Sequence, residues 1–186
     1  QRLTSQVMKN HQKSYVGNGM IEKHAKHYYG KDKNFEQFIY FSQLTQRKAV
    51  SMAIAGHRAD APRCMGTIYW QLNDCWPAPT WSSLDDQLNW KALHYSVRED
   101  YRPIAVLELI KEDRTYLVLT SDLPEDTLVT VQMEFYDLNG RLQDTQRRTY
   151  PIQQNTVQVL SALTPGKQGF VKVILDEQYE RLFTFV

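Results

Sequence analysis

The amino-acid composition of the chain changes abruptly near Arg102–Pro103, and this change limits the folds that the chain can adopt. Residues 1–102 contain all five histidines, all four tryptophans and both cysteines, whereas residues 103–186 contain none of these. A chain of 186 residues is long enough for one large domain or for two small ones. The change in composition therefore favours two domains of different kinds, residues 1–102 and residues 103–186.

The second segment consists of short runs of β-branched and aromatic residues separated by turn sequences. Apolar and polar residues alternate over residues 129–135, as in a strand with one buried face, and Asn139-Gly140 is a strong hairpin signal. Further turns are expected at residues 112–114, 122–126, Pro151 and 164–166. The expected strands are Ile104–Lys111, Thr115–Thr120, Leu128–Tyr136, Arg141–Tyr150, Thr156–Leu160, Gly169–Asp176 and Arg181–Val186. Seven short strands favour an antiparallel β-sandwich of immunoglobulin-like type, although the Cys…Trp…Cys core of antibody domains is absent.

The first segment is expected to be mainly helical. Ile21–Tyr29 is a candidate helix that ends at Gly30, a residue suited to the C-terminal end of a helix. Asn34 can cap the next helix, with Gln37 as its capping-box partner. That helix is expected from Phe35 to about His57, with an apolar stripe wide enough to pack against a sheet.

A buried strand is expected at Gly66–Leu72, because this segment is short, apolar and rich in aromatic and β-branched residues. Pro77 and Pro79 prevent its continuation, and a shorter helix is expected at about Trp90–Asp100. The order helix, strand, loop, helix amounts to one and a half βα units. This is too little to close any α/β fold.

Charge and hydropathy exclude several classes of function. The 22 basic and 21 acidic side chains leave a formal net charge of +1, so no nucleic acid and no anionic membrane is expected as a partner. No apolar run approaches the roughly 18 residues of a membrane span. Cys64 and Cys75 flank the expected strand and are too far apart for a disulfide, so free thiols are expected. The chain begins at Gln1 without an initiator Met or signal peptide, which suggests a processed chain or a fragment.

Common catalytic and metal-binding motifs are absent from the sequence. There is no G-x-S-x-G elbow, P-loop or G-x-G-x-x-G sequence. His24 and His27 have a helical spacing that can share a metal ion, but lysines surround them and no acidic residue completes a motif. A solvated basic helix face is therefore expected there, with no metal and no cofactor. Asp85 and Asp86 are adjacent and are expected to be turn residues rather than a catalytic pair of carboxylates.

The tryptophans gather in one segment, which is the first candidate for function. Trp70, Asn73 and Asp74 lie near the C-terminal end of the expected strand, where barrels and open sheets bind ligands. An indole ring covers the C–H face of a sugar, and amide and carboxylate groups bind its hydroxyls. The alternative is a core Trp70, with Asn73 and Asp74 building the turn before Pro77.

This segment carries a resemblance to a known family. The stretch Arg63-Cys-Met-Gly-Thr-Ile-Tyr-Trp-Gln-Leu-Asn-Asp-Cys-Trp-Pro-Ala-Pro-Thr-Trp-Ser-Ser-Leu-Asp, with Trp90-Lys-Ala-Leu-His-Tyr and the helix Phe35–Arg58, resembles the eighth barrel strand and its surroundings in β-mannosidases of glycoside hydrolase family 2. The resemblance extends from about Ile21 to Pro103. It implies that residues 1–102 are the last part of a TIM barrel and that residues 103–186 are the immunoglobulin-like domain that follows the barrel.

The resemblance also implies a function. Such enzymes remove terminal β-mannosyl residues from non-reducing ends with retention, using one glutamate as nucleophile and another as acid/base. Neither glutamate motif occurs in this chain, so both are expected upstream of residue 1. Trp70 matches the tryptophan that forms one wall of the terminal-sugar site, and Asn73, Asp74 and Trp76 follow it in the same motif. Trp81, Trp90 and His94 also match family positions and are interpreted as packing residues.

The expected partners are a mannoside or oligosaccharide substrate, bound through the intact enzyme, and the remainder of the parent chain. A glycan-degrading parent fits a periplasmic, secreted or lysosome-like compartment. Two alternatives are a non-catalytic carbohydrate-binding or interaction module, and a family 2 glycosidase of another specificity, such as a galactosidase or glucuronidase.

Overall fold

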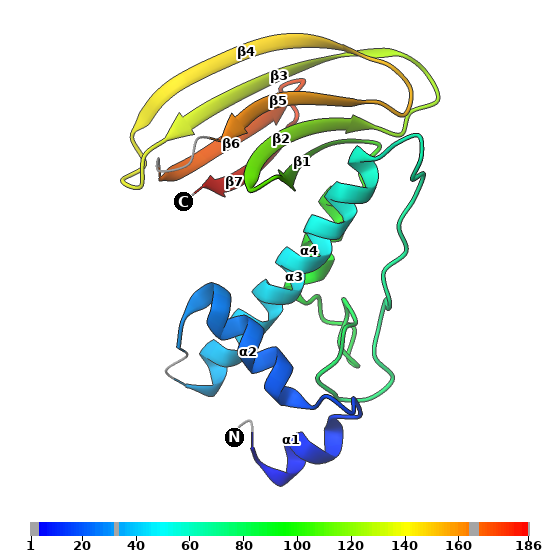
Figure 1. The fold of residues 1–186 in the computed structure, drawn as a ribbon, viewed down its shortest axis with the longest axis vertical. Coiled ribbons are helices and arrows are strands. Elements are labelled where there is room, and N and C mark those ends of the chain that lie inside the picture. The colour runs from blue at the N-terminus through cyan, green and yellow to red at the C-terminus, as the bar shows by residue number, and fades with distance from the viewer. Residues whose placement is uncertain (1–3, 32–33, 164–167, 186) are drawn as a thin grey trace. The chain divides into compact units, whose positions relative to one another are not determined.

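The structure, a computed structural model, describes residues 4–31, 34–163 and 168–185. It divides into two compact units (Figure 1). The helical unit comprises Gln1–Ala53 and Ile68–Glu99, and the β-sheet unit comprises Ile54–Thr67 and Asp100–Val186. In the described ranges, no helix is both long enough and apolar enough to cross a membrane.

The described residues form four helices, and the sequence predicts three of them. They are α1 (Gln6–His11), α2 (Asn18–Tyr29), α3 (Phe35–Ala59) and α4 (Ala92–Asp100). The predicted caps are confirmed, because Gly30 ends α2 at a φ of 72° and the backbone N–H of Gln37 donates to Oδ1 of Asn34 over 2.9 Å. The short helix α1 is not predicted.

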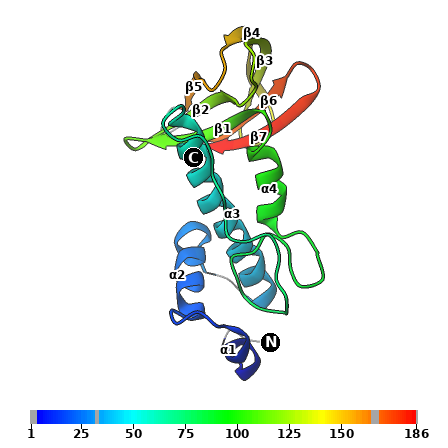
Figure 2. The ribbon, with the colours of Figure 1, turned by 90° about the vertical axis from the view of Figure 1, so that its right-hand side faces the viewer.

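Within the helical unit, α3 and α4 lie side by side (Figure 2). Gln43 of α3 accepts a hydrogen bond from the first backbone N–H of α4, that of Ala92, over 3.0 Å. One turn further along, Arg47 donates to the Ser96 hydroxyl over 2.6 Å. Leu93 of α4 is completely buried. Hydrogen bonds and the burial of apolar side chains therefore both hold α4 against α3.

The predicted buried strand Gly66–Leu72 is wrong for this structure, because the segment pairs with no neighbouring strand among the described residues. Its alternate side chains are exposed instead, and Ile68 is 98% accessible. The nearest β-type pairing consists of isolated bridges from Leu84 to Asn73 and to Trp90. A strand is stabilised by its ladder, so a strand-like sequence without partners stays irregular.

The β-sheet unit contains the seven predicted strands, all paired antiparallel. They are β1 (Ile104–Lys111), β2 (Arg114–Ser121), β3 (Thr127–Tyr136), β4 (Leu142–Ile152), β5 (Val157–Leu163), β6 (Gly169–Leu175) and β7 (Tyr179–Phe185). One sheet has the order β1-β2-β5 and the other β4-β3-β6-β7. Leu117 and Leu119 of the first sheet share a core with Val131 and Val173 of the second, so the sheets pack face to face.

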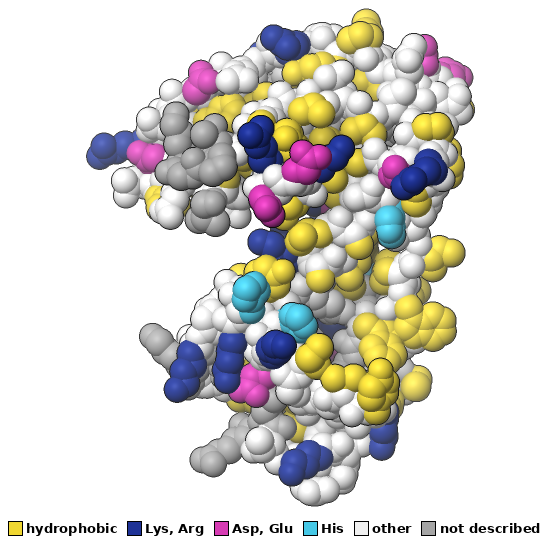
Figure 3. All heavy atoms as spheres, in the orientation of Figure 1, with side chains coloured by type: hydrophobic (Ala, Val, Ile, Leu, Met, Phe, Trp, Pro, Cys, Tyr) yellow, Lys and Arg dark blue, Asp and Glu magenta, His cyan; other side chains and the backbone are white. Residues whose placement is uncertain are grey.

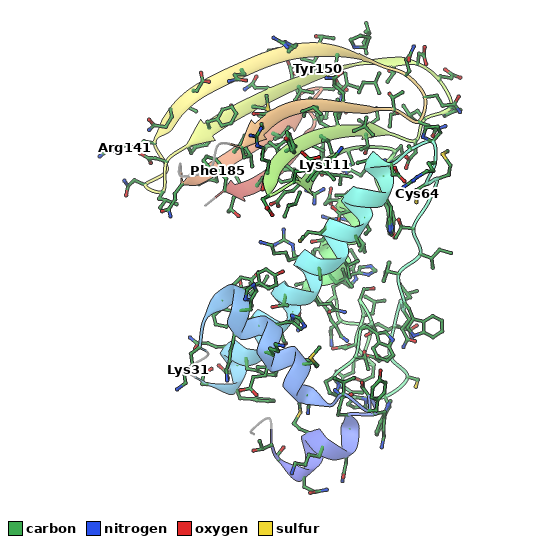
Figure 4. The ribbon with its side chains drawn as sticks, in the orientation of Figure 1. Lys31, Cys64, Lys111, Arg141, Tyr150 and Phe185 are labelled. Atoms are coloured by element: carbon green, nitrogen blue, oxygen red, sulfur yellow. The ribbon has the colours of Figure 1, made fainter. Side chains whose placement is uncertain are left out.

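Two turn predictions in this unit have different outcomes. The Asn139-Gly140 hairpin is confirmed between β3 and β4, where Gly140 has a φ of 78°, and Figure 4 labels Arg141 at its tip. The turn predicted at Pro151 is wrong, because Pro151 lies inside β4 opposite Leu128. β4 is an edge strand, where a proline without an N–H does not interrupt a ladder. The turn predicted at 164–166 lies outside the described residues.

Arg58, near the end of α3, binds the chain that leads into β1. Its guanidinium donates to the carbonyls of Asp100, Arg102 (2.9 Å) and Pro103 (3.3 Å) and pairs with the Asp122 carboxylate at 2.9 Å. Its side chain is only 7% exposed. Burial lowers the pKa of Arg58, and the Asp122 carboxylate opposes this shift. The buried Arg58 guanidinium therefore stabilises the segment that leads into β1.

We expect Arg58→Ala to lower the free energy of unfolding of the β-sheet unit by about 2–4 kcal/mol, because several carbonyls lose a charged donor. Urea unfolding monitored by circular dichroism measures the effect. Arg63→Ala is the matched control, because Arg63 pairs with Asp60 at the surface with its side chain 86% exposed, and it should unfold like the parent chain. Equal midpoints for the two variants would contradict the role of Arg58.

Hydrogen exchange should distinguish the strand-like segment from the sandwich. In the described part of the chain, no backbone carbonyl accepts from the N–H groups of residues 65–68, so these amides should exchange fastest. The amides of β2 and β3, which are central strands, should be protected at the level of global unfolding. Slow exchange at residues 65–68 in the monomer would contradict the irregular conformation.

Candidate functional site

The loop from Ile68 to Lys91 in the helical unit contains a buried ion pair. The Lys91 ammonium lies 2.9 Å from Oδ2 of Asp74, and the two side chains are 14% and 4% exposed. The Ser82 hydroxyl donates to the same carboxylate oxygen over 2.6 Å, and Thr80 donates to the other oxygen over 2.6 Å. Lys91 also donates to Oγ of Ser82 over 2.6 Å. Both charges are therefore hydrogen-bonded as well as paired.

This environment keeps Asp74 ionised. Burial by itself would raise the pKa of Asp74, but the hydrogen bonds from Ser82, Thr80 and Lys91 and the positive charge of Lys91 outweigh it. The net effect is a lowered pKa. Both oxygens of the buried Asp74 carboxylate therefore accept hydrogen bonds within the loop, which stabilises it.

A second set of hydrogen bonds is centred on the neighbouring residue, Ser83, which is completely buried. Its hydroxyl lies 2.8 Å from the Tyr69 hydroxyl and 2.9 Å from Nδ1 of His94, and it donates to the Leu72 carbonyl over 3.0 Å. Its backbone N–H donates to the carbonyls of Gln71 and Leu72 over 3.1 and 3.2 Å. The peptide bond between Trp70 and Gln71 is cis.

The four residues that the sequence predicts for sugar binding differ in exposure and in hydrogen bonding. Trp70 is 72% exposed and Trp76 37% exposed. Asn73 is also exposed, and its side-chain amide donates to the Asp74 carbonyl over 3.3 Å. Asp74 is directed away from them into the buried ion pair. Of the four, Trp70, Asn73 and Trp76 remain able to contact a ligand.

Trp76 has aromatic and basic neighbours that the sequence does not predict. The His11 ring stacks on it with a centroid distance of 4.6 Å and an interplanar angle of 17°, and His11 also hydrogen-bonds the Pro77 carbonyl. The ammonium of Lys13 lies 5.3 Å from the indole centroid. These contacts connect the N-terminal helix region to the loop, and the stacked His11 ring covers one face of Trp76.

Of the residues interpreted as packing, Trp90 and His94 have aromatic contacts, whereas Trp81 is largely exposed. Trp90 packs edge-on against His94 and Tyr95, with centroid distances of 4.4 and 4.9 Å. Trp81 is 53% exposed, so packing does not explain it within this chain. Exposed apolar side chains gather over the loop, at the lower right of Figure 3. They include Ile68, Trp70, Leu72, Trp76, Trp81 and Leu88.

Other chemical candidates have structural explanations. Asp85 builds a turn, because its carboxylate accepts from the backbone N–H groups of Gln87 and Asn89 over 2.9 and 2.8 Å. His24 and His27 lie on α2. Among the described residues, no group of three or more side chains could hold a metal ion. Cys64 and Cys75 are both free thiols.

The partners of Asp74 and Ser83 are the residues that sequence reasoning missed. Lys91 and His94 occur in the quoted Trp90–Tyr95 motif, but nothing local shows that they reach back to the loop. The signal that could have found them is the small polar run Thr80–Ser83 between aromatic residues, since buried hydroxyls need polar partners.

Comparison with known proteins connects this loop to one family, although no family model matches the chain. The chain is 33% identical over 143 residues to β-mannosidase A of Aspergillus terreus, which covers 74% of this chain and 14% of that protein. It is 35% identical over 113 residues to β-mannosidase A of Aspergillus fumigatus, covering 58% of this chain and 12% of that protein. A β-mannosidase of Capra hircus is 34% identical over 101 residues, covering 50% and 12%.

The chain is a homologue of part of the β-mannosidases. The resemblance that the sequence predicts is thereby confirmed, and the chain spans 12–14% of the length of these relatives. Solved structures show the same fold. The β-D-mannosidase of Dictyoglomus thermophilum has a TM-score of 0.83 at 20% identity, over 98% of this chain and 24% of that chain. The exo-chitosanase of Amycolatopsis orientalis has a TM-score of 0.77 at 16% identity, over 94% and 22%.

We expect the stabilisation by Asp74 to depend on pH in a defined direction. Its pKa is lower in the folded chain than in the unfolded chain, so its ionised form stabilises the fold above about pH 5 and this contribution is lost as the pH falls below about 4. Asp74→Asn should lower the free energy of unfolding by about 2–3 kcal/mol at pH 7. The difference from the parent chain should shrink towards pH 2 in urea titrations, whereas a constant difference would exclude a charge effect.

Proposed function

We propose that this chain is part of a retaining β-mannosidase of glycoside hydrolase family 2, an enzyme that hydrolyses terminal, non-reducing β-D-mannose residues. The observation that carries the proposal is the 33–35% identity to proteins named β-mannosidase. The chain would contribute part of the sugar-binding wall, while the catalytic glutamates belong to the remainder of the parent chain. No cofactor takes part in this reaction class.

The proposal assigns residues 1–102 to the last part of a TIM barrel. The exposed segment Gly66–Leu72 supports this assignment, because its apolar side chains and its lack of a sheet ladder among the described residues suit a strand that neighbouring barrel strands would cover. Residues 103–186 are assigned to an immunoglobulin-like domain. The strand orders β1-β2-β5 and β4-β3-β6-β7 support it, since they equal strands A-B-E and C′-C-F-G of that architecture.

Trp70 is the residue proposed to contact the terminal sugar. Its indole is the most exposed of the four tryptophans, at 72%, and an exposed ring can stack on the C–H face of a pyranose. Asn73 and Trp76 follow it on the exposed side of the loop and are proposed as further contacts with a mannoside or oligosaccharide. Asp74 is proposed to support the loop from within rather than to bind sugar.

A family 2 enzyme of another specificity is the second candidate. The structural similarity to an exo-chitosanase, with a TM-score of 0.77, shows that the fold occurs in an enzyme named for another sugar. A fold shared at such low identity does not select a substrate. The sequence relationship, which is with β-mannosidases, makes mannosidase the preferred proposal.

The test uses the complete enzyme that contains this segment and an aryl β-mannoside. Trp70→Ala should lower kcat/KM by about 10–100-fold, because the sugar loses its stacking surface and its alignment. Trp81→Ala, an exposed tryptophan of the same loop, is the matched control and should retain most activity. The 186-residue chain alone should show no turnover above its own Trp70→Ala variant, because it lacks both glutamates.

Two outcomes would contradict the proposal. Turnover by the isolated chain that depends on Trp70 would show that it carries its own catalytic groups. Efficient hydrolysis of an aryl β-glucosaminide with no hydrolysis of the mannoside would instead favour the second candidate.

A further inference from the structure

The residues on either side of Trp70 are hydrogen-bonded to the interior of the loop. Because the indole is 72% exposed, packing restrains it only weakly. An exposed and weakly restrained ring loses conformational entropy when it binds a ligand, so a binding wall benefits from a fixed backbone. The question is which residue fixes the backbone around Trp70.

One buried residue contacts the chain before and after Trp70. The Ser83 hydroxyl lies 2.8 Å from the Tyr69 hydroxyl, and the Ser83 backbone N–H donates to the Gln71 carbonyl over 3.1 Å. The same hydroxyl reaches the Leu72 carbonyl over 3.0 Å. Ser83 is completely buried, so these bonds do not compete with solvent.

His94 completes the hydrogen bonding of this hydroxyl. A serine hydroxyl donates one hydrogen bond and accepts two. Donation to the Leu72 carbonyl leaves Oγ to accept from the Tyr69 hydroxyl and from Nδ1–H of His94, which lies 2.9 Å away. All three capacities of the Ser83 hydroxyl are then used, which leaves it one orientation. The edge-on contact with Trp90, at 4.4 Å between ring centroids, holds the imidazole of His94.

We propose that Ser83, oriented by His94, is a positioning residue that fixes the Trp70 indole for contact with the terminal sugar. The proposal rests on the proposed function for the role of Trp70, but the positioning itself can be measured without substrate. Under this proposal, the two adjacent serines Ser82 and Ser83 have different roles. Ser82 serves the Asp74–Lys91 ion pair, and Ser83 serves the segment that carries Trp70.

The first experiment measures the position of Trp70 in the 186-residue chain labelled with 5-fluorotryptophan. The four fluorine resonances are assigned by replacing each tryptophan with phenylalanine in turn. Ser83→Ala should shift or broaden the Trp70 resonance by more than its linewidth and leave those of Trp76 and Trp81 unchanged. A general loss of stability would move all of them together.

Two further variants keep this experiment decisive. Tyr69→Phe removes one hydroxyl from a partly exposed ring and should produce the same selective change, so it decides the matter if Ser83→Ala does not fold. Ser42→Ala is the matched control, because the Ser42 hydroxyl donates only to the Ile39 carbonyl of its own helix. An unchanged Trp70 resonance in both Ser83→Ala and Tyr69→Phe would overturn the proposal.

The second experiment compares kinetics in the complete enzyme with an aryl β-mannoside. Ser83→Ala should raise KM about tenfold with a smaller change in kcat, because a misplaced wall weakens sugar binding. A reduced apparent kcat at unchanged KM would indicate a smaller folded fraction and would overturn the positioning role. If Trp70→Ala leaves the kinetics unchanged, the proposed contact of Trp70 with the sugar fails, while the fluorine spectra still decide whether Ser83 positions Trp70.

Discussion

The ion pair between Asp74 and Lys91 is the constraint on which the loop of the helical unit depends. A segment without a sheet ladder must satisfy its buried polar groups by other means. Here the carboxylate accepts from Ser82 and Thr80 as well as from the lysine, so that neither charge is left unpaired. Loss of one partner would leave the other charge buried and alone, a situation that costs more than the intact pair contributes. The loop is thereby ordered from its interior, and its outer side is left free for aromatic side chains.

The dipeptide Ser82-Ser83 divides the polar groups of this loop between two tasks. Ser82 bonds towards the ion pair and Ser83 bonds towards the segment around Trp70. The two adjacent hydroxyls have different partners, so they take part in two networks without competing. The network around the ion pair and the network around the Trp70 segment are therefore connected by the peptide bond between Ser82 and Ser83.

The sequence predicts the β-sheet unit better than the loop, and the reason is physical. Strands such as Ile104–Lys111 are marked by local patterns and find their partners within the same unit. Gly66–Leu72 has an equally good strand pattern, yet a ladder needs a partner that the pattern cannot supply. From the sequence, Asp74 is either a sugar contact at the end of the expected strand or a residue that builds the turn before Pro77. In the structure it pairs with Lys91, which lies 17 positions further along the chain, a distance over which periodicity carries no information.

Specificity within the proposed function cannot come from the backbone or from Trp70. The structures of a β-D-mannosidase and of an exo-chitosanase both match this fold, with TM-scores of 0.83 and 0.77, so one scaffold accommodates enzymes named for different sugars. An indole ring stacks on C–H faces that different pyranoses share, and it therefore supplies affinity and alignment with little discrimination. Selection between sugars that differ at one hydroxyl or amine requires hydrogen-bonding groups that are left unpaired by the wrong substrate. In this loop Asn73 is an exposed polar side chain three positions after Trp70, and further groups of that kind would come from the rest of the parent chain under the proposed function. This chain would thus hold and orient the sugar, while most of the discrimination lies elsewhere.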